Sequence, residues 1–183
     1  MRLFAMRGFD HVTVAEIAEA ADVSEKTVFN YFSTKEDIFF DEVPARLELL
    51  AKAIRDRKRG ESVFSVLRRL QSRDAERLTS ERFATFARII EESHALQTKE
   101  LELMGRFADV LATTLEAELD VKELDARIAA NALVSVQWQI FRNARRAALE
   151  GKHGPAAERK LRGDLNRAYM LLEHGLSALE DAT

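Results

Sequence analysis

A short segment of the chain, TVAEIAEAADVSEKTVFNYF (13–32), combines apolar residues at helical spacing with side chains that could bind another molecule. Val28 and Phe32 lie four residues apart and should face a core together with Val23, so the residues between them must face outward. They supply a carboxylate, an ammonium group, hydroxyls, an amide and two rings: Glu25, Lys26, Thr27, Phe29, Asn30 and Tyr31. This set is unusually mixed for a face that contacts only water. Two short helices joined by a tight turn are the sequence form of a helix-turn-helix, which indicates DNA binding.

Capping patterns place the ends of these two helices. Thr13 stands three residues before Glu16, the spacing of a capping box, so the first helix should begin at Val14. Its apolar residues recur at helical spacing and should face a core: Val14, Ile17, Ala18 and Ala21. After a turn at Asp22, Ser24 is well suited to cap the second helix.

Helices are also expected on both sides of this pair. RLFAMRGF (2–9) is typical of the last turns of a helix closed by Gly8, with Phe9 folded back onto it. Ser33 stands three residues before Glu36, so a further capping box should open the next helix. Three helices in under forty residues predict a compact trihelical head.

These motifs follow one another in the order and at the spacing of a known family. The segment LFAMRGFDHVTVAEIAEAADVSEKTVFNYFSTKEDIF resembles the N-terminal domain of TetR-family transcriptional regulators, through RGF, TVAEIA, VS followed by TVFNYF, and KED. The resemblance covers about the first forty residues, and the remainder shares only the helical character and helix lengths. It implies a homodimer that places one recognition helix per subunit in successive major grooves of a palindromic double-stranded DNA operator.

The resemblance also implies roles for individual side chains. Phosphates would be held by Thr13, Thr27, Tyr31 and Lys35, assisted by the N-terminus of the helix that opens at Lys35. Base edges would be met by Glu25, Lys26, Phe29 and Asn30. Lysine can donate to guanine, asparagine suits adenine, glutamate can accept from cytosine, and phenylalanine can touch a thymine methyl group. Ser24, the cap of the recognition helix, completes the predicted DNA-binding set.

Three features of the head depart from the family pattern. The chain starts at Met1, halfway through the expected first helix, so the upstream half of that helix and any basic arm are missing from it. Position 22 carries Asp where the family often has Gly, although aspartate tolerates the left-handed region better than most residues. Phe29 stands where many members carry tyrosine, and it cannot donate a hydroxyl to DNA.

The head is acidic. Residues 1–43 contain four basic and nine acidic side chains, a balance of −5. Nonspecific DNA affinity comes mainly from phosphate neutralisation, so this head should bind poorly away from its specific site. Residues 44–79 contain ten basic and five acidic side chains, a balance of +5, which we interpret as a solvated helix face rather than a DNA contact.

The whole chain is expected to be helical. Two prolines and seven glycines in 183 residues, with apolar residues at helical spacing, are typical of an all-α protein. We expect a three-helix N-terminal helix-turn-helix head at residues 1–43, its first helix truncated, and a C-terminal bundle of about six helices at residues 44–183. The resemblance assigns the second part to ligand binding and dimerisation. Its helices are predicted over residues 35–59 with a break near Pro44, 62–72, 80–95, 96–119, 122–150 and 155–179.

Several kinds of protein are not expected. The chain has no cysteine, which excludes disulfides and cysteine metal sites and agrees with a reducing compartment. No apolar run approaches the roughly 20 residues of a membrane span, and no signal peptide precedes the head. The histidines are scattered, and no phosphate-binding glycine loop or nucleophile elbow occurs. We therefore expect a cytoplasmic protein that is not an enzyme and has no metal, cofactor or membrane partner.

Two stripes near the C-terminus are candidates for a dimer surface. In the last predicted helix the stripe consists of Leu161, Leu165, Ala168, Leu172, Leu176 and Leu179, and in the preceding helix of Ile128, Leu133, Val134, Gln137 and Phe141. Such stripes pack helices into bundles. They could equally close the core of a monomer, and only the family resemblance favours the dimer. The predicted interface residues are Leu133, Gln137, Phe141, Leu165, Ala168, Leu172 and Leu176.

The middle of the chain is the candidate site for a small-molecule effector. It carries aromatic residues and methionine that could surround an apolar compound, although such residues at helical spacing more often form plain core. Asn131 falls within an otherwise mostly apolar series, where an unpaired amide would be costly unless water or an interface satisfied it. The predicted ligand residues are Phe86, Ile90, His94, Met104, Phe107, Asn131, Ser135 and Trp138.

Together these patterns predict a ligand-responsive, TetR-like transcriptional regulator, most simply a repressor. It would bind a palindromic operator as a homodimer and be released when an effector binds. The alternative is a helical ligand-binding or protein-interaction dimer without competent DNA binding, which the truncated first helix and the acidic head favour.

Overall fold

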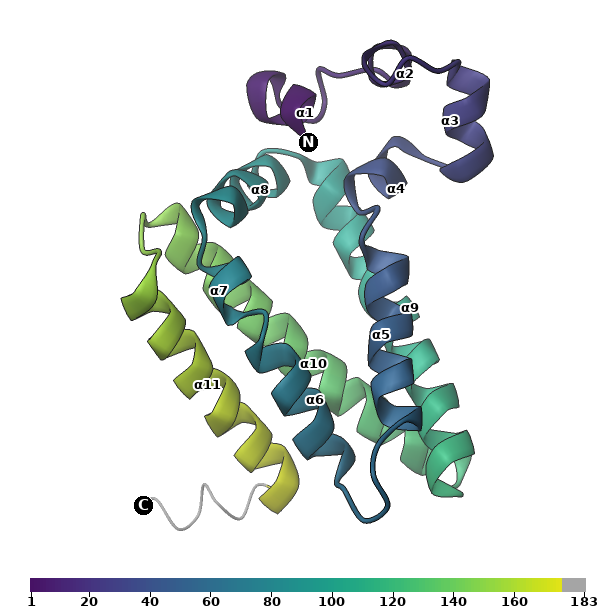
Figure 1. Cartoon of the computed structure of the whole chain (residues 1–183), viewed down its shortest axis with the longest axis vertical. Helices are drawn as coiled ribbons and strands as arrows, with labels where there is room; N and C mark the ends of the chain where they lie inside the picture. Colours follow the sequence, from purple (N-terminus) through teal and green to yellow (C-terminus); the bar gives the residue numbers. More distant parts are fainter. Residues whose placement is uncertain (176–183) are drawn as a thin grey trace.

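The chain folds into α-helices joined by short loops. The computed structural model describes residues 1–175, in which eleven helices and no strand occur (Figure 1). Four short helices form the head: α1 (Arg2–Arg7), α2 (Val14–Ala20), α3 (Glu25–Tyr31) and α4 (Lys35–Phe39). The head lies at one end of a body made of longer helices (Figure 1). This arrangement confirms the predicted all-α fold with a helix-turn-helix head and a helical C-terminal part.

The predicted caps begin α2 and α3. The Thr13 hydroxyl accepts a hydrogen bond from the Glu16 N–H at 3.2 Å, and the Glu16 carboxylate accepts one from the Thr13 N–H at 2.8 Å. Ser24 caps α3 by accepting from the Thr27 N–H at 3.1 Å. In the turn between the two helices, Asp22 adopts a left-handed conformation with φ 55°, which aspartate tolerates better than most residues.

The cap of α4 differs from the prediction by one residue. Thr34 and Asp37 form the capping box, and Ser33 and Glu36 do not. Both pairs have the required spacing, so the sequence alone does not separate them. The observed register lets the Asp37 carboxylate accept from the Thr34 N–H and also pair with Lys99 of the body at 3.0 Å.

Apolar side chains of the head pack mostly as predicted. Gly8 ends α1 with a positive φ of 78°, and Phe9 folds back so that its ring centroid lies 5.1 Å from that of Phe4. Val28 is buried. Val23 was expected to face inward with it, but Val23 is exposed because it lies in the turn before α3 rather than on a helix face.

Seven helices form the body: α5 (Val43–Arg55), α6 (Val63–Ser72), α7 (Ala75–Leu78), α8 (Glu81–Glu91), α9 (His94–Leu119), α10 (Glu123–Leu149) and α11 (Pro155–His174). The predicted break near Pro44 is confirmed, since α4 ends before it and Pro44 lies in the first turn of α5. No helix in residues 1–175 is both long and apolar enough to cross a membrane.

Some helix boundaries differ from the predictions. The α5 helix ends at Arg55, short of the predicted residue 59, and α8 ends at Glu91 because Ser93 caps the next helix. The four-residue helix α7 was not predicted. The predicted end of the last helix, including Leu176 and Leu179, lies outside the described residues.

Two clusters of buried apolar side chains hold the molecule together. The larger one fills the space between the helices of the body. The smaller one joins head and body: Phe4, Phe9, Val12, Phe39 and Phe40 pack with Ile89, Ile90, Leu96 and Leu103 of α8 and α9. The head is therefore packed onto the body, and a division into two domains at residue 43 stays a prediction.

Candidate nucleic-acid interface and ligand pocket

The α3 helix presents its predicted contact side chains to solvent. Phe29 is 52% exposed and Tyr31 is 81% exposed. Glu25, Lys26 and Asn30 are also exposed. The helix therefore displays hydrogen-bond donors, acceptors and two rings on a surface that no other described part of the chain covers.

The hydroxyl groups beside this surface are partly engaged. The Thr27 hydroxyl lies 2.8 Å from that of Ser24. The exposed Thr13 hydroxyl lies 3.0 Å from the Glu16 carboxylate, which also receives a hydrogen bond from Arg7 at 2.6 Å. The hydrogen bond from the Thr13 N–H has the largest effect on Glu16 and the one from Arg7 the next largest, and together they lower the pKa of Glu16 to about 2. A fixed negative charge thus stands at the N-terminus of α2.

Lys35 is held inside the head. Its Nζ donates to the carbonyl oxygens of Phe9 at 3.0 Å and Val12 at 2.9 Å, and it lies 4.3 Å from the centroid of the Phe9 ring. These contacts tie the start of α4 to the loop before α2. The sequence assigned Lys35 to DNA phosphate, but most of its donor capacity is used within the fold.

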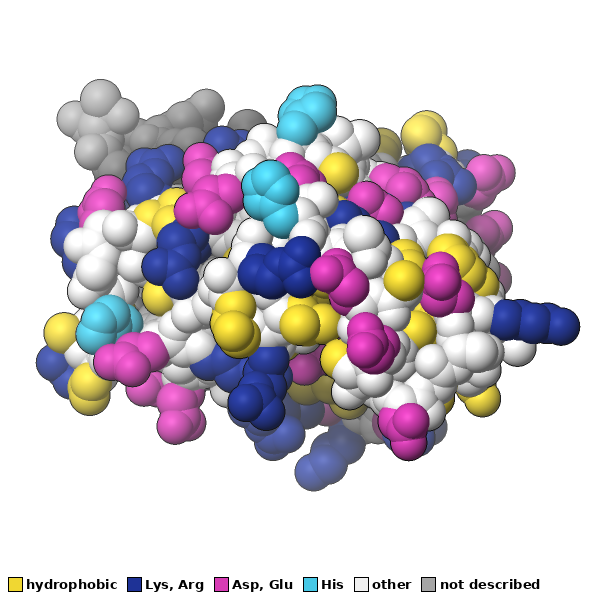
Figure 2. Space-filling view, turned by 90° about the horizontal axis from the view of Figure 1, so that it is seen from above, with side chains coloured by type: hydrophobic (Ala, Val, Ile, Leu, Met, Phe, Trp, Pro, Cys, Tyr) yellow, Lys and Arg dark blue, Asp and Glu magenta, His cyan; other side chains and the backbone are white. Residues whose placement is uncertain are grey.

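Few positive charges of the head remain available. Arg7 and Lys35 are engaged within the head, whereas Arg2 and Lys26 are exposed and have no ion pair in the described residues. Figure 2, viewed from the side of the head, shows basic and acidic side chains interspersed rather than gathered in a basic patch. Electrostatic attraction to a phosphate backbone is therefore weak on this face.

Aromatic rings connect the head to the interior of the body. Phe39 of α4 stacks on Phe86 of α8, with ring centroids 4.8 Å apart and an interplanar angle of 15°. Phe39 also meets Phe9 at 5.8 Å, and Phe86 meets Phe141 of α10 at 6.4 Å. A chain of ring contacts therefore extends from α4 to α10.

Polar contacts reinforce this junction. Lys99 of α9 pairs with Asp37 of α4 at 3.0 Å, and the Ser93 hydroxyl donates to Asp10 at 2.8 Å. Burial opposes ionisation of Asp37, but hydrogen bonds from Lys99 and Thr34 outweigh it and lower its pKa. Burial also opposes the charged form of Lys99, which by itself would lower its pKa. The contacts with Asp37 and Glu102 outweigh burial, so the pKa of Lys99 is raised.

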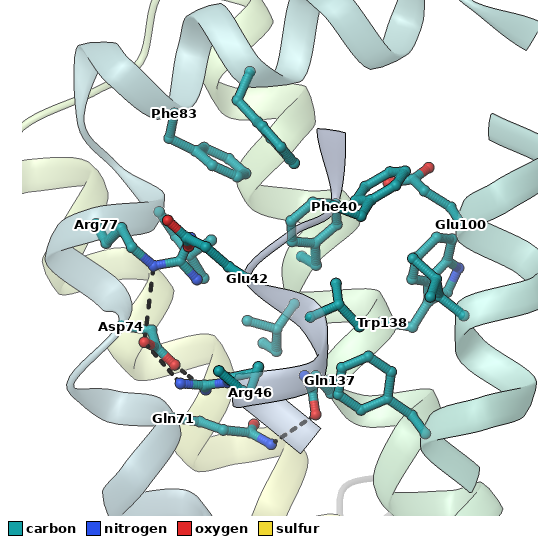
Figure 3. A pocket seen from close by; sticks show the side chains of 18 of the residues that line it. Phe40, Glu42, Arg46, Gln71, Asp74, Arg77, Phe83, Glu100, Gln137 and Trp138 are labelled. Carbon is teal, nitrogen blue, oxygen red and sulfur yellow. Dashed lines mark hydrogen bonds and ion pairs between the residues drawn. The ribbon is translucent and has the colours of Figure 1, made fainter. Parts of the chain in front are cut away.

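A cavity of about 560 Å³ lies next to the junction. It is lined by residues of α4 and α5, of the segment from α6 to α8, and of α9 and α10, so it lies between the head and the centre of the body (Figure 3). Its aromatic lining consists of Phe39, Phe40, Phe83, Phe86, Phe107, Trp138 and Phe141. The volume and the apolar wall are typical of small-molecule sites.

Half of the predicted ligand residues line this cavity: Phe86, Met104, Phe107 and Trp138. Ile90 is fully buried in the cluster that joins head and body. His94 and Ser135 are exposed outside the cavity. Asn131 is exposed too, and its amide donates to the Arg127 carbonyl at 2.8 Å, so it needs no ligand. The helix faces that carry these four residues thus point to solvent or to the head, and not to the cavity.

The sequence did not indicate most polar groups of the cavity wall. Arg46 of α5 forms two hydrogen bonds with the Asp74 carboxylate, which Arg77 also approaches at 3.9 Å (Figure 3). Gln71 donates to Gln137 at 3.3 Å. Of these, the sequence singled out only Gln137, as a predicted dimer residue. The sequence missed the others for two reasons. The charges of residues 44–79 were interpreted as a solvated face. The short helix α7, which turns Asp74 inward, has no sequence signal strong enough for this helix to be predicted.

The predicted dimer residues mostly face the inside of the single chain. Leu133 and Leu165 are each 2% exposed, and Leu172 and Ala168 are partly buried. Gln137 and Phe141 line the cavity. The buried leucines pack in the core of the body, which is the alternative that the sequence left open, and the dimer surface stays a prediction. Leu176 lies outside the described residues.

The fold and the exposed α3 helix define a helix-turn-helix protein whose head is packed onto a helical body with a cavity beside the junction. Residues 1–41 match the family model described as bacterial regulatory proteins, tetR family. The head of the chain is therefore similar to the N-terminal part of TetR-family proteins.

Two individual proteins show the extent of this similarity. The HTH-type transcriptional regulator TcmR of Streptomyces glaucescens is 28% identical over 132 residues, which cover 66% of this chain and 58% of that protein. The alignment thus spans less than two thirds of the relative. The crystal structure of Thermus thermophilus FadR, described as a TetR-family transcriptional repressor in complex with lauroyl-CoA, is similar with a TM-score of 0.53 and 23% identity. That similarity covers 96% of this chain and 90% of FadR, and it shows a shared fold.

Proposed function

We propose that this protein is a ligand-responsive transcriptional regulator, acting as a repressor that binds a palindromic operator as a homodimer. The exposed face of α3 carries the proposal, because it holds an amide, an ammonium group, a carboxylate and two rings on a short, capped helix of the right size for the major groove. The family of the head supports the same function.

In this proposal the side chains of α3 read bases and the flanking groups set the register. Asn30 binds adenine, Lys26 donates to guanine, Glu25 accepts from cytosine, and Phe29 contacts a thymine methyl group. Phosphates are bound by the Tyr31 hydroxyl together with Thr13, Thr27 and the Ser24 cap. Lys35 acts mainly by fixing α4 against the rest of the head, since its ammonium group is bonded to two carbonyl oxygens.

The sparse positive charge predicts a weak salt dependence. Arg2 and Lys26 are the exposed basic residues of each head that have no ion pair in the described residues, so a dimer neutralises about four phosphates. The slope of log affinity against log salt concentration should then be about −4 or shallower. Specific base contacts must therefore supply most of the selectivity.

An effector in the cavity could act on the head directly. Phe39 and Phe40 line the cavity and also belong to the cluster that holds the head on α8 and α9. A ligand that displaces Phe86 would change the stacking on Phe39 and so the orientation of α4. Occupation of the cavity therefore favours a head position that no longer matches operator spacing, and linkage requires operator DNA to weaken effector binding by the same factor.

The dimer would use the outer faces of the last two helices. Leu124 and Ile128 of α10 and Met170 of α11 are exposed in the single chain. A partner subunit that covers them removes apolar surface from water. Light scattering of Ile128→Asp tests this surface, with Leu101→Asp on the exposed face of α9 as the matched control. Only the first variant should become monomeric.

The central experiment measures DNA binding by fluorescence anisotropy. Duplexes enriched from a random pool by the wild-type chain are titrated with wild type and Asn30→Ala. Selective binding that depends on Asn30 supports the regulator. Failure to enrich any sequence, together with retained dimerisation, supports the alternative of a helical ligand-binding dimer. The hydrogen bonds that hold Arg7 and Lys35 within the head favour this alternative.

A further inference from the structure

A buried carboxylate on α9 lies in the wall of the cavity and has one oxygen without a hydrogen-bond partner. Glu100 lines the cavity and is 4% exposed. Its Oε2 accepts a hydrogen bond from Arg145 at 2.7 Å, and the same guanidinium lies 3.8 Å from the more exposed Glu91. Its Oε1 is buried without a hydrogen-bond partner. The Tyr169 hydroxyl is the other such atom in residues 1–175, and it does not line the cavity.

The surroundings of Glu100 make its free oxygen a strong acceptor. Figure 3 shows Glu100 on the same side of the cavity as Trp138, among aromatic side chains. Burial raises the pKa of Glu100, and the hydrogen bond and charge of Arg145 oppose the rise. A buried carboxylate oxygen without a donor is costly, so a donor that reaches it gains a charge-assisted hydrogen bond.

The other charged groups of the wall are either exposed to water, as Asp41, Glu42 and Arg82 are, or already paired. Asp74 is bonded to Arg46 and approached by Arg77 on the opposite side of the cavity (Figure 3). The amides of Gln71 and Gln137 are bonded to each other. Glu100 therefore supplies the one buried wall oxygen, among the described residues, that still lacks a donor.

We propose that the cavity takes an apolar, ring-bearing amine whose ammonium group donates to Oε1 of Glu100. The rings of Phe86, Phe107 and Trp138 hold the apolar part, and the carboxylate fixes its polar end. This proposal rests on the proposed function, because it names the chemical class of the effector for the same cavity.

Three probes of equal length test the proposal on the wild-type protein: phenylbutylamine, phenylpropyl methyl ether and phenylbutanoate. Trp138 is the single tryptophan of the chain and lines the cavity, so its fluorescence reports binding, with calorimetry as a second measurement. The amine should bind at least about tenfold more tightly than the ether, because a hydrogen bond to a charged group provides a gain in affinity of that size. The carboxylate probe should bind most weakly.

Two variants assign the preference to one carboxylate. Glu100→Gln should reduce the ratio of amine to ether affinity to less than about threefold, because the charge-assisted bond is lost. Glu91→Gln is the matched control, since Glu91 pairs with the same Arg145 but does not line the cavity. It should leave the ratio unchanged.

The possible failures are distinguishable. Equal binding of amine and ether to the wild type, or an unchanged ratio in a Glu100→Gln variant with a wild-type circular dichroism spectrum, overturns the assignment to Glu100 and leaves the cavity as a ligand site. If none of the three probes binds, the proposed ligand class is overturned, while the proposed function is tested separately by the DNA selection.

Discussion

The ion pair between Lys99 and Asp37 should be a measurable tether between head and body. It links α9 to α4 across 3.0 Å, with the lysine side chain 11% exposed and the aspartate side chain 25% exposed. Asp37 also caps α4, so a single substitution would change two interactions. A double-mutant cycle with Lys99→Met and Asp37→Asn separates the pair from the cap.

The coupling energy can be bounded from the geometry. At 3.0 Å, Coulomb's law gives about 1.4 kcal/mol in water and about 5.5 kcal/mol at an effective dielectric constant of 20. Exposed pairs deliver only about 0.2 to 1 kcal/mol after screening and side-chain ordering. Since this pair is mostly but not fully buried, we expect about 1 to 2 kcal/mol of coupling in the free energy of unfolding.

Urea denaturation at fixed protein concentration measures the four free energies, and hydrogen exchange of residues 35–40 reports the attachment of α4. The control is a second cycle on Lys52 and Asp56, an exposed i,i+4 pair with side chains 64% and 60% exposed, for which coupling should stay below about 0.5 kcal/mol. A Lys99–Asp37 coupling as small as this control would refute the tether. Unchanged exchange of residues 35–40 in Lys99→Met would do so as well.

Three further predictions test other parts of the structure. The pKa of Glu16 is lowered from 4.5 to about 2, so the stabilisation that its charge gives the head is present above pH 4.5 and is lost as the pH falls toward 2. The stability of Glu16→Gln should therefore depend less on pH in that window than the stability of the wild type. An acid transition by circular dichroism that is the same in both would contradict this. Leu133→Ala should lower the free energy of unfolding by about 2 to 5 kcal/mol without raising the dimer dissociation constant, and the opposite pattern would restore Leu133 as an interface residue. Asn30→Ala should relax specificity at one base pair at a cost of about 1 to 3 kcal/mol, whereas Tyr31→Phe should weaken all sequences alike; identical specificity profiles of the two variants in a binding selection would sink both assignments.

The head was largely predictable because its signals are local. The spacing of Thr13 and Glu16, and the position of Ser24, determine where two helices begin, and the structure agrees. The cap of α4 was not separable in this way, since Ser33 and Thr34 both offer the required spacing. A contact with Lys99, more than sixty residues away, accompanies the observed register.

The cavity could be predicted only in part because it depends on how helix faces are rotated. Periodicity located aromatic residues such as Phe86 and Trp138, which do line it. It did not show that Asn131 faces solvent or that Lys35 donates to backbone carbonyl groups. Nor does any local pattern mark Glu100, whose importance comes from burial and from one unpaired oxygen.

The central claim is that α3 reads a specific DNA sequence, and selection from a random duplex pool tests it most directly. Wild-type protein should enrich a palindrome with half-sites about one helical turn apart, and binding to it should show a salt slope of about −4 or shallower. Asn30→Ala should lose the preference at one position of each half-site. Enrichment of no sequence by folded wild-type protein, or an identical motif for Asn30→Ala, would contradict the account.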